Sequence, residues 1–155
     1  MYIDWKNPDP FRHMTSFPSP DRDRAQAQDW LNAFFGDIDR MDAAAFAARF
    51  DPVEGSFRFG NESPLVGRDT IAGGAGYIFG LLKDIRHDVA RFWIAEDHIL
   101  AEGDVHYLRA SDDLALSVPF FSVFELRGER VGSYRVYVDS HALFDPPVEA
   151  ASNDC

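Results

Sequence analysis

The chain contains 155 residues with a mass of 17.5 kDa, the size of one domain that buries its own hydrophobic core. Hydrophobic residues make up 46% of the sequence and aromatic residues 14%, which argues against a disordered chain. A formal net charge of −11 repels nucleic-acid phosphates and anionic membranes, so we expect neither as a partner. No apolar run approaches the ~18 residues of a membrane-spanning helix, and the first residues lack the apolar centre of a secretory signal. We therefore predict a cytoplasmic protein.

The reactive side chains show no pattern of a metal or cofactor site. Cys155 is the only cysteine, which argues against disulfides and cysteine-based metal sites. The histidines lack the close spacings typical of zinc ligands; they are His13, His87, His98, His106 and His141. The chain also lacks a Gly-x-Ser-x-Gly nucleophile motif and a Gly-Lys-Ser/Thr phosphate loop. We predict chemistry without a metal or a cofactor.

The N-terminal third of the chain predicts an irregular arm followed by two helices. Residues 1–18 contain three prolines among charged and aromatic residues, and we expect this arm to lie across the domain. A helix start follows at 19–21, with a serine N-cap, a proline and an acid. Apolar side chains then recur at three- and four-residue spacing, at Trp30, Leu31, Phe34, Phe35 and Ile38. Asp42 begins a second, shorter helix.

The middle of the chain predicts one short strand and one glycine-rich helix. The sequence GSFRFG at 55–60 indicates the strand. The helix begins at Gly67-Arg68-Asp69 and continues through Gly73-Gly74-Ala75-Gly76. We interpret these glycines as positions that let the helix approach a neighbouring sheet.

The C-terminal half predicts four consecutive antiparallel strands. We expect strands at 86–95 and 99–110, then two long arms between 114 and 144 that are joined by a turn at 127–130. Helices that precede a run of strands are typical of an α+β fold with an antiparallel sheet. The prediction is one α+β domain at 19–145, between the arm at 1–18 and a mobile tail at 146–155.

The order of these elements resembles a known family. Together with the helix start at Gly67-Arg68-Asp69 and the ending YRVYVD at 134–139, it resembles the SnoaL-like branch of the nuclear-transport-factor-like superfamily over residues 22–144. The resemblance implies a cystatin-like cone, in which a curved antiparallel sheet wraps around helices and leaves an apolar pocket. We expect this pocket to bind a small hydrophobic molecule through Trp30, Phe34, Tyr77, Phe120, Ser122 and Tyr134.

This chain lacks the catalytic residues of two activities that are found in this superfamily. Ketosteroid isomerases use an aspartate base where this chain has Arg58, and their oxyanion-hole groups fall at about Phe34 and Ser122. Limonene epoxide hydrolases use an arginine and two aspartates where this chain has Asp104, His106 and Val136, by a comparison without gaps. We expect neither activity.

The first candidate site is His106 with Asp104, two residues apart on one strand face. A histidine oriented by a carboxylate acts as a general base near neutral pH. The resemblance places His106 at a position where relatives have a catalytic acid. The alternative is that His106 forms a hydrogen bond within the core or lies in water at the pocket mouth.

The second candidate is the row Arg135, Tyr137 and Asp139. These side chains either line a pocket or form an ion pair that fixes strand register or a dimer interface. The resemblance favours the second reading, because it turns the row of Tyr134, Val136 and Val138 inward.

These observations predict a cofactor-free acid–base enzyme: an isomerase, dehydratase, cyclase or hydrolase related to the polyketide cyclases. The alternative is a non-catalytic ligand-binding or dimerisation module, which a pocket too small or too dry for a ligand would favour. Strands that are apolar on both faces leave Phe121 and Val123 in need of cover, so we expect a homodimer through the outer face of the sheet.

Overall fold

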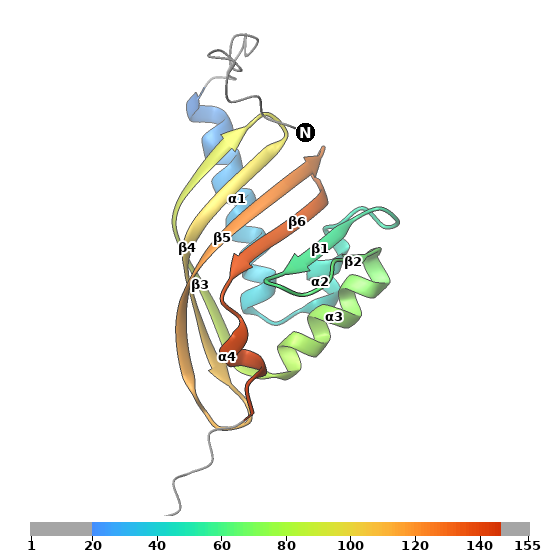
Figure 1. The fold of residues 1–155 in the computed structure, drawn as a ribbon. Helices are drawn as coiled ribbons and strands as arrows, with labels where there is room; N and C mark the ends of the chain where they lie inside the picture. The colour runs from blue at the N-terminus through green and yellow to red at the C-terminus, as the bar shows by residue number, and fades with distance from the viewer. Residues whose placement is uncertain (1–19, 147–155) are drawn as a thin grey trace, which may run out of the picture.

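The computed structural model describes residues 20–146, and the expected arm and nearly all of the expected tail lie outside them (Figure 1). The helices are α1 (Pro20–Asp39), α2 (Ala43–Ala48), α3 (Arg68–Gly80) and α4 (His141–Phe144). The strands are β1 (Ser56–Phe59), β2 (Leu65–Val66), β3 (Leu82–Ala95), β4 (His98–Arg109), β5 (Ala115–Arg127) and β6 (Arg130–Val138). This order confirms the predicted α+β class. Among the described helices, none is both long and apolar enough to cross a membrane.

One sheet of six strands, in the order β2-β1-β6-β5-β4-β3, organises the domain. The four long strands form the expected antiparallel meander. The sheet is nevertheless mixed, because β1 pairs in parallel with β6, with Phe57 opposite Tyr134. This parallel pair brings the short strand from the middle of the chain beside the last strand, where their aromatic side chains stack.

The long strands bend around α1 and form a concave face (Figure 1). A β-bulge contributes to this bend, since the register of β3 against β4 shifts between Val89 and Arg91. Gly103 lies opposite the bulge, and a Cβ there would approach the Asp88 carbonyl oxygen to 1.9 Å. Only glycine admits so close an approach of the two backbones.

An aromatic core fills most of the concave face. Phe34 of α1 is fully buried and contacts Trp30 at 5.2 Å, Phe124 at 4.9 Å and Tyr134 at 4.9 Å between ring centroids. Tyr134 in turn stacks on Phe124 at 4.6 Å. Edge-to-face and stacked pairs at these distances add to the free energy gained from burial. The predicted helix face of aromatic residues therefore packs directly against β5 and β6.

Helix α4 is fastened to the end of β4 by a buried arginine. The Arg109 Nη1 group donates to the carbonyl oxygens of Ala142, at 2.5 Å, and Asp145, at 3.2 Å. Its Nε and Nη2 groups bind Asp112, with Nε to Oδ1 at 2.8 Å. This network places Phe144 beside α3.

Candidate active site

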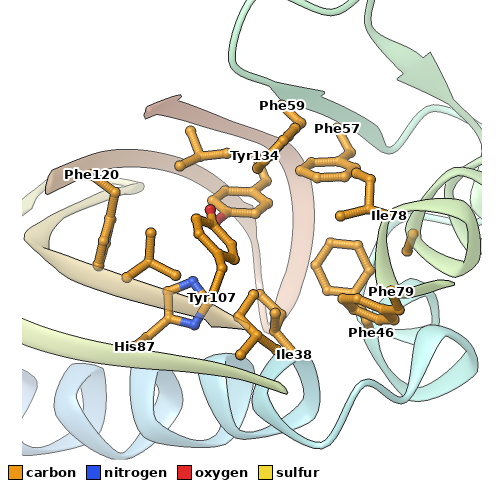
Figure 2. Close-up of a pocket in the computed structure, with 14 residues that line it drawn as sticks. Ile38, Phe46, Phe57, Phe59, Ile78, Phe79, His87, Tyr107, Phe120 and Tyr134 are labelled. Atoms are coloured by element: carbon orange, nitrogen blue, oxygen red, sulfur yellow. The ribbon is translucent and has the colours of Figure 1, made fainter. Parts of the chain in front are cut away.

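A small apolar cavity lies between the concave face of the sheet and the helices (Figure 2). Its volume is about 40 Å³. Helices α1, α2 and α3 contribute Ile38, Phe46 and Ile78 to the lining, and the strands contribute Phe57, Phe120 and Val136. The cavity is a gap between the side chains of the aromatic core.

One ionisable side chain that lines the cavity, His87 of β3, forms a hydrogen bond with a carboxylate. Its Nδ1 lies 2.6 Å from Oδ1 of Asp39, the last residue of α1. The backbone N–H of His87 donates to the other carboxylate oxygen at 3.2 Å. Asp39 therefore forms hydrogen bonds with both the imidazole ring of His87 and the backbone of β3.

The aspartate also determines the tautomer of His87. An ionised carboxylate only accepts hydrogen bonds, so in the neutral imidazole Nδ1 carries the proton and Nε2 has the lone pair. The ring is 8% exposed, stacks on Phe35 at 4.6 Å and meets Phe120 edge-on at 5.4 Å. Figure 2 shows the ring directed into the cavity, which leaves Nε2 as the basic atom there.

Two buried tyrosines supply the other polar atoms of the cavity. Burial raises the pKa of both Tyr107 and Tyr134, and the neighbouring Tyr134 raises the pKa of Tyr107 further. The Tyr134 hydroxyl lies 3.5 Å from Oγ of Ser122, a long contact that lowers its pKa slightly against the larger effect of burial. Both phenols are therefore neutral hydrogen-bond donors at ordinary pH.

A wider groove adjoins the cavity. Phe57, Phe59 and Ile78 line both spaces. The groove has a volume of about 260 Å³ and extends past Leu65, Tyr77 and Phe144 to the polar side chains of Glu62 and Ser63. The apolar cavity and the surface groove thus share three lining side chains.

Solved structures with this architecture cover most of the chain. A nuclear-transport-factor-like (NTF2-like) protein from Burkholderia pseudomallei has a TM-score of 0.66 at 11% identity, over 75% of this chain and 92% of the other. A protein named as a SnoaL-like polyketide cyclase from Jannaschia has a TM-score of 0.62 at 12% identity, over 75% and 89%. An LEH-like epoxide hydrolase from M. tuberculosis has a TM-score of 0.63 at 18% identity, over 77% and 87%.

The chain has the nuclear-transport-factor-like fold. The resemblance seen in the sequence is confirmed at this level, and the low identities carry no activity with them. No protein-family model and no curated protein matches the sequence.

The nuclear-transport-factor-like fold brings only some of the predicted pocket residues to the cavity. Phe120 and Tyr134 line it. Trp30 and Phe34 pack in the neighbouring aromatic core, and Ser122 is buried behind Tyr134. Tyr77 is 65% exposed and lies in the groove instead.

The expected position of His106 and Asp104 is wrong. Val105 and Tyr107 of β4 line the cavity, so the alternation of the strand turns Asp104 and His106 to the outer face. His106 is 35% exposed there, and its partners are Asp88, at 2.8 Å, and Ser117, at 2.9 Å. The comparison without gaps did not determine which residues of β4 point inward, because a shift of one residue exchanges the two faces of a strand.

The second row also lies away from the cavity. Arg135 and Tyr137 pair across the outer face with Val123 and Phe121. Asp139 follows the strand, and its Oδ1 accepts from the backbone N–H of His141 at 3.1 Å. The row therefore does not line this cavity, and its role in an ion pair that fixes strand register or in a dimer interface stays a prediction.

Sequence reasoning missed His87, which belongs to neither of the two candidate sites. The strand begins earlier, at Leu82, so that His87 lies in its interior. Ile85, His87 and Val89 alternate along one face, and this pattern was the available signal. Asp39 is 48 positions away, and no local pattern joins it to His87.

Proposed function

We propose that this protein binds a small hydrophobic molecule in the inner cavity and carries out cofactor-free acid–base chemistry on it, with His87 as the base. The observation that supports this most is the half-buried Asp39–His87 pair at the edge of an otherwise apolar cavity. Perturbed or precisely oriented titratable groups in a cleft mark candidate functional sites.

The proposed chemistry begins with removal of a proton. Nε2 of His87 takes a proton from a carbon next to a carbonyl group, and the electrons of the broken C–H bond move toward the carbonyl oxygen. Asp39 stabilises the resulting imidazolium through the 2.6 Å hydrogen bond at Nδ1. The neutral hydroxyls of Tyr107 and Tyr134 would donate to the oxygen as it gains charge. The proton then returns to the substrate at another atom, which completes an isomerisation, dehydration or cyclisation.

The known names of proteins with this fold agree with such a class of reaction. One is named as a polyketide cyclase and another as an epoxide hydrolase. Among residues 20–146, moreover, no three potential ligands gather as a metal site would require. The proposed step uses only side chains of the chain itself.

The volume of the cavity favours a second candidate. About 40 Å³ holds roughly three water molecules and falls below the roughly 300 Å³ of an ordinary ligand pocket. A non-catalytic module that uses the cavity only for packing is therefore the alternative function. Measurements of ligand binding and of proton transfer separate the two.

Hydrogen–deuterium exchange of cyclic ketones tests the proposed base. The protein is incubated in D₂O with small cyclic ketones, and loss of the protons next to the carbonyl is followed by NMR. The wild type should accelerate the exchange, and His87→Gln should lower the rate about 10²–10⁴-fold, the usual contribution of a general base.

His106→Gln is the matched control, because His106 also binds an aspartate but lies on the outer face. It should leave the exchange rate unchanged. A lower rate for His106→Gln together with a normal rate for His87→Gln would return the base to the position first expected from the sequence. The absence of both ketone binding and accelerated exchange would support the non-catalytic module.

A further inference from the structure

The glycines of α3 are mostly not required by its packing. Four of its 13 residues are glycine. Gly74 alone packs tightly, since a Cβ there would lie 2.1 Å from Cδ1 of Leu65 on β2. A Cβ at Gly73 would meet nothing within 4 Å, and one at Gly76 would only touch Ala43 at 4.0 Å. The predicted close approach to the sheet thus explains one glycine of the cluster.

These glycines weaken the part of α3 that follows its first turn. Each glycine in a helix interior costs roughly 1 kcal/mol relative to alanine. The N-cap of α3 is Gly67, which offers no side-chain hydrogen bond, and no basic residue lies in the last turn. Ile71 and Ala75 are its only buried residues. The start of α3 is held by hydrogen bonds from Arg68 to the carbonyl oxygens of Ala48 and Phe50. Its glycine-rich second half is held only by an apolar stripe in which Ile78 and Phe79 are partly buried, so this half opens at lower cost than the start.

This weak helix carries the wall between the cavity and the groove. Ile78 lines both, and Tyr77 beside it is exposed in the groove. Displacement of Ile78 with α3 would join the two spaces along Phe57 and Phe59. The joined volume would reach the lower range of ordinary ligand pockets, which the cavity alone does not.

We propose that cavity and groove form one binding site for an elongated, mostly apolar molecule, and that α3 opens to admit it. The inner end of the molecule lies at His87, and its chain passes Ile78 into the groove. Its outer end reaches Glu62 and Ser63, which fit a hydrogen-bond donor such as a hydroxyl. The reaction at the inner end of the molecule, at His87, rests on the proposed function. The binding of the molecule and the opening of α3 do not.

A series of 4-alkylcyclohexanones measures the length of the site. Calorimetry should give an affinity that rises by up to about fourfold for each methylene that enters the groove. A terminal hydroxyl on the alkyl chain should be tolerated at the length that reaches Glu62, and Glu62→Leu should remove any preference for it. An affinity that falls as soon as the ring carries an alkyl chain, or no binding of any member, would overturn the joined site.

Two substitutions in α3 test its opening. Gly73→Ala with Gly76→Ala stabilises the helix without a steric clash, so the association rate of the ketones should fall by up to about fivefold per substitution. Hydrogen exchange of the α3 amides should slow in parallel. The control is Gly36→Ala in α1, where only the flexible end of Arg40 lies near the new Cβ, and it should leave the association rate unchanged.

Equal association rates for the wild type and the α3 double variant, with equal amide exchange, would refute the opening of α3. Failure of the catalytic proposal has a different signature. In that case the ketones bind with the expected dependence on length, and His87→Gln changes neither their affinity nor any exchange rate.

Discussion

His87 and His106 show how the surroundings of one side chain decide its chemistry. Each ring is hydrogen-bonded to an aspartate, at 2.6 Å for Asp39 and 2.8 Å for Asp88. The His87 ring is 8% exposed and the His106 ring 35%. Water competes for every hydrogen bond of His106, whereas Nε2 of His87 faces apolar side chains and is free to act on a bound molecule.

The two buried tyrosines give a prediction at the same scale. Burial raises the pKa of Tyr107 and Tyr134, so the folded state holds their protons more tightly than the unfolded state does. The stability that depends on these protons is fully present below the unfolded value of about 10 and is lost as the pH rises through the folded values. Two phenolates should therefore appear together with unfolding, as followed by ultraviolet absorbance and circular dichroism.

Replacing Tyr107 and Tyr134 by phenylalanine is the control for this titration. The double variant should lose the phenolate signal that accompanies unfolding. Ionisation of all tyrosines before any change in circular dichroism would contradict the burial of these two hydroxyls.

At the scale of elements, one buried side chain connects α4 to the end of β4. The Arg109 side chain is 3% exposed and holds two carbonyl oxygens at the end of the chain's last described helix. Arg109→Met would leave these carbonyls and the largely buried Asp112 without the arginine. We expect faster amide exchange at 140–146 and a melting temperature lower by about 5 °C or more.

Arg127→Met is the matched control, because Arg127 pairs with Glu54 on the surface, where both side chains are exposed. Exposed ion pairs contribute little, so this variant should melt close to the wild type. Equal melting temperatures for all three proteins would show that α4 is held by Leu143 packing instead.

At the scale of the whole molecule, the outer face of the sheet carries an aromatic and apolar patch. Trp93 is 43% exposed and Tyr137 54%, and the Trp93 ring lies 6.3 Å from that of Phe121. Charges of both signs border the patch, among them the Arg91–Glu102 ion pair at 2.6 Å. A face with this mixture complements a second copy of itself about a twofold axis.

We therefore expect a homodimer through this patch. Light scattering at micromolar concentration should give about twice the chain mass of 17.5 kDa. Phe121→Asp should halve that mass, because it places a charge at the centre of the interface. Val53→Asp is the control, since Val53 is 76% exposed and lies in the loop between α2 and β1, outside the strands that carry the patch. A wild-type mass near 17.5 kDa would refute the dimer.

Several features of the protein follow from its sequence alone. Helical spacing of Trp30 and Phe34 predicted the aromatic face of α1, and β-branched and aromatic runs predicted the four long strands. The inward row that contains Tyr134 followed from the family resemblance. Local spacing and composition are enough for the helix face and the strands, because each depends on neighbours along the chain.

The candidate site was decided only by tertiary structure. Alternation along β4 separates two faces but does not say which one meets the helices, and a shift of one residue exchanges Tyr107 for His106. Asp39 and His87 meet because α1 ends beside the edge strand β3, 48 positions later in the chain. A site made of such a long-range contact leaves no periodic trace in the sequence, since its geometry exists only after the sheet has curved around the helix.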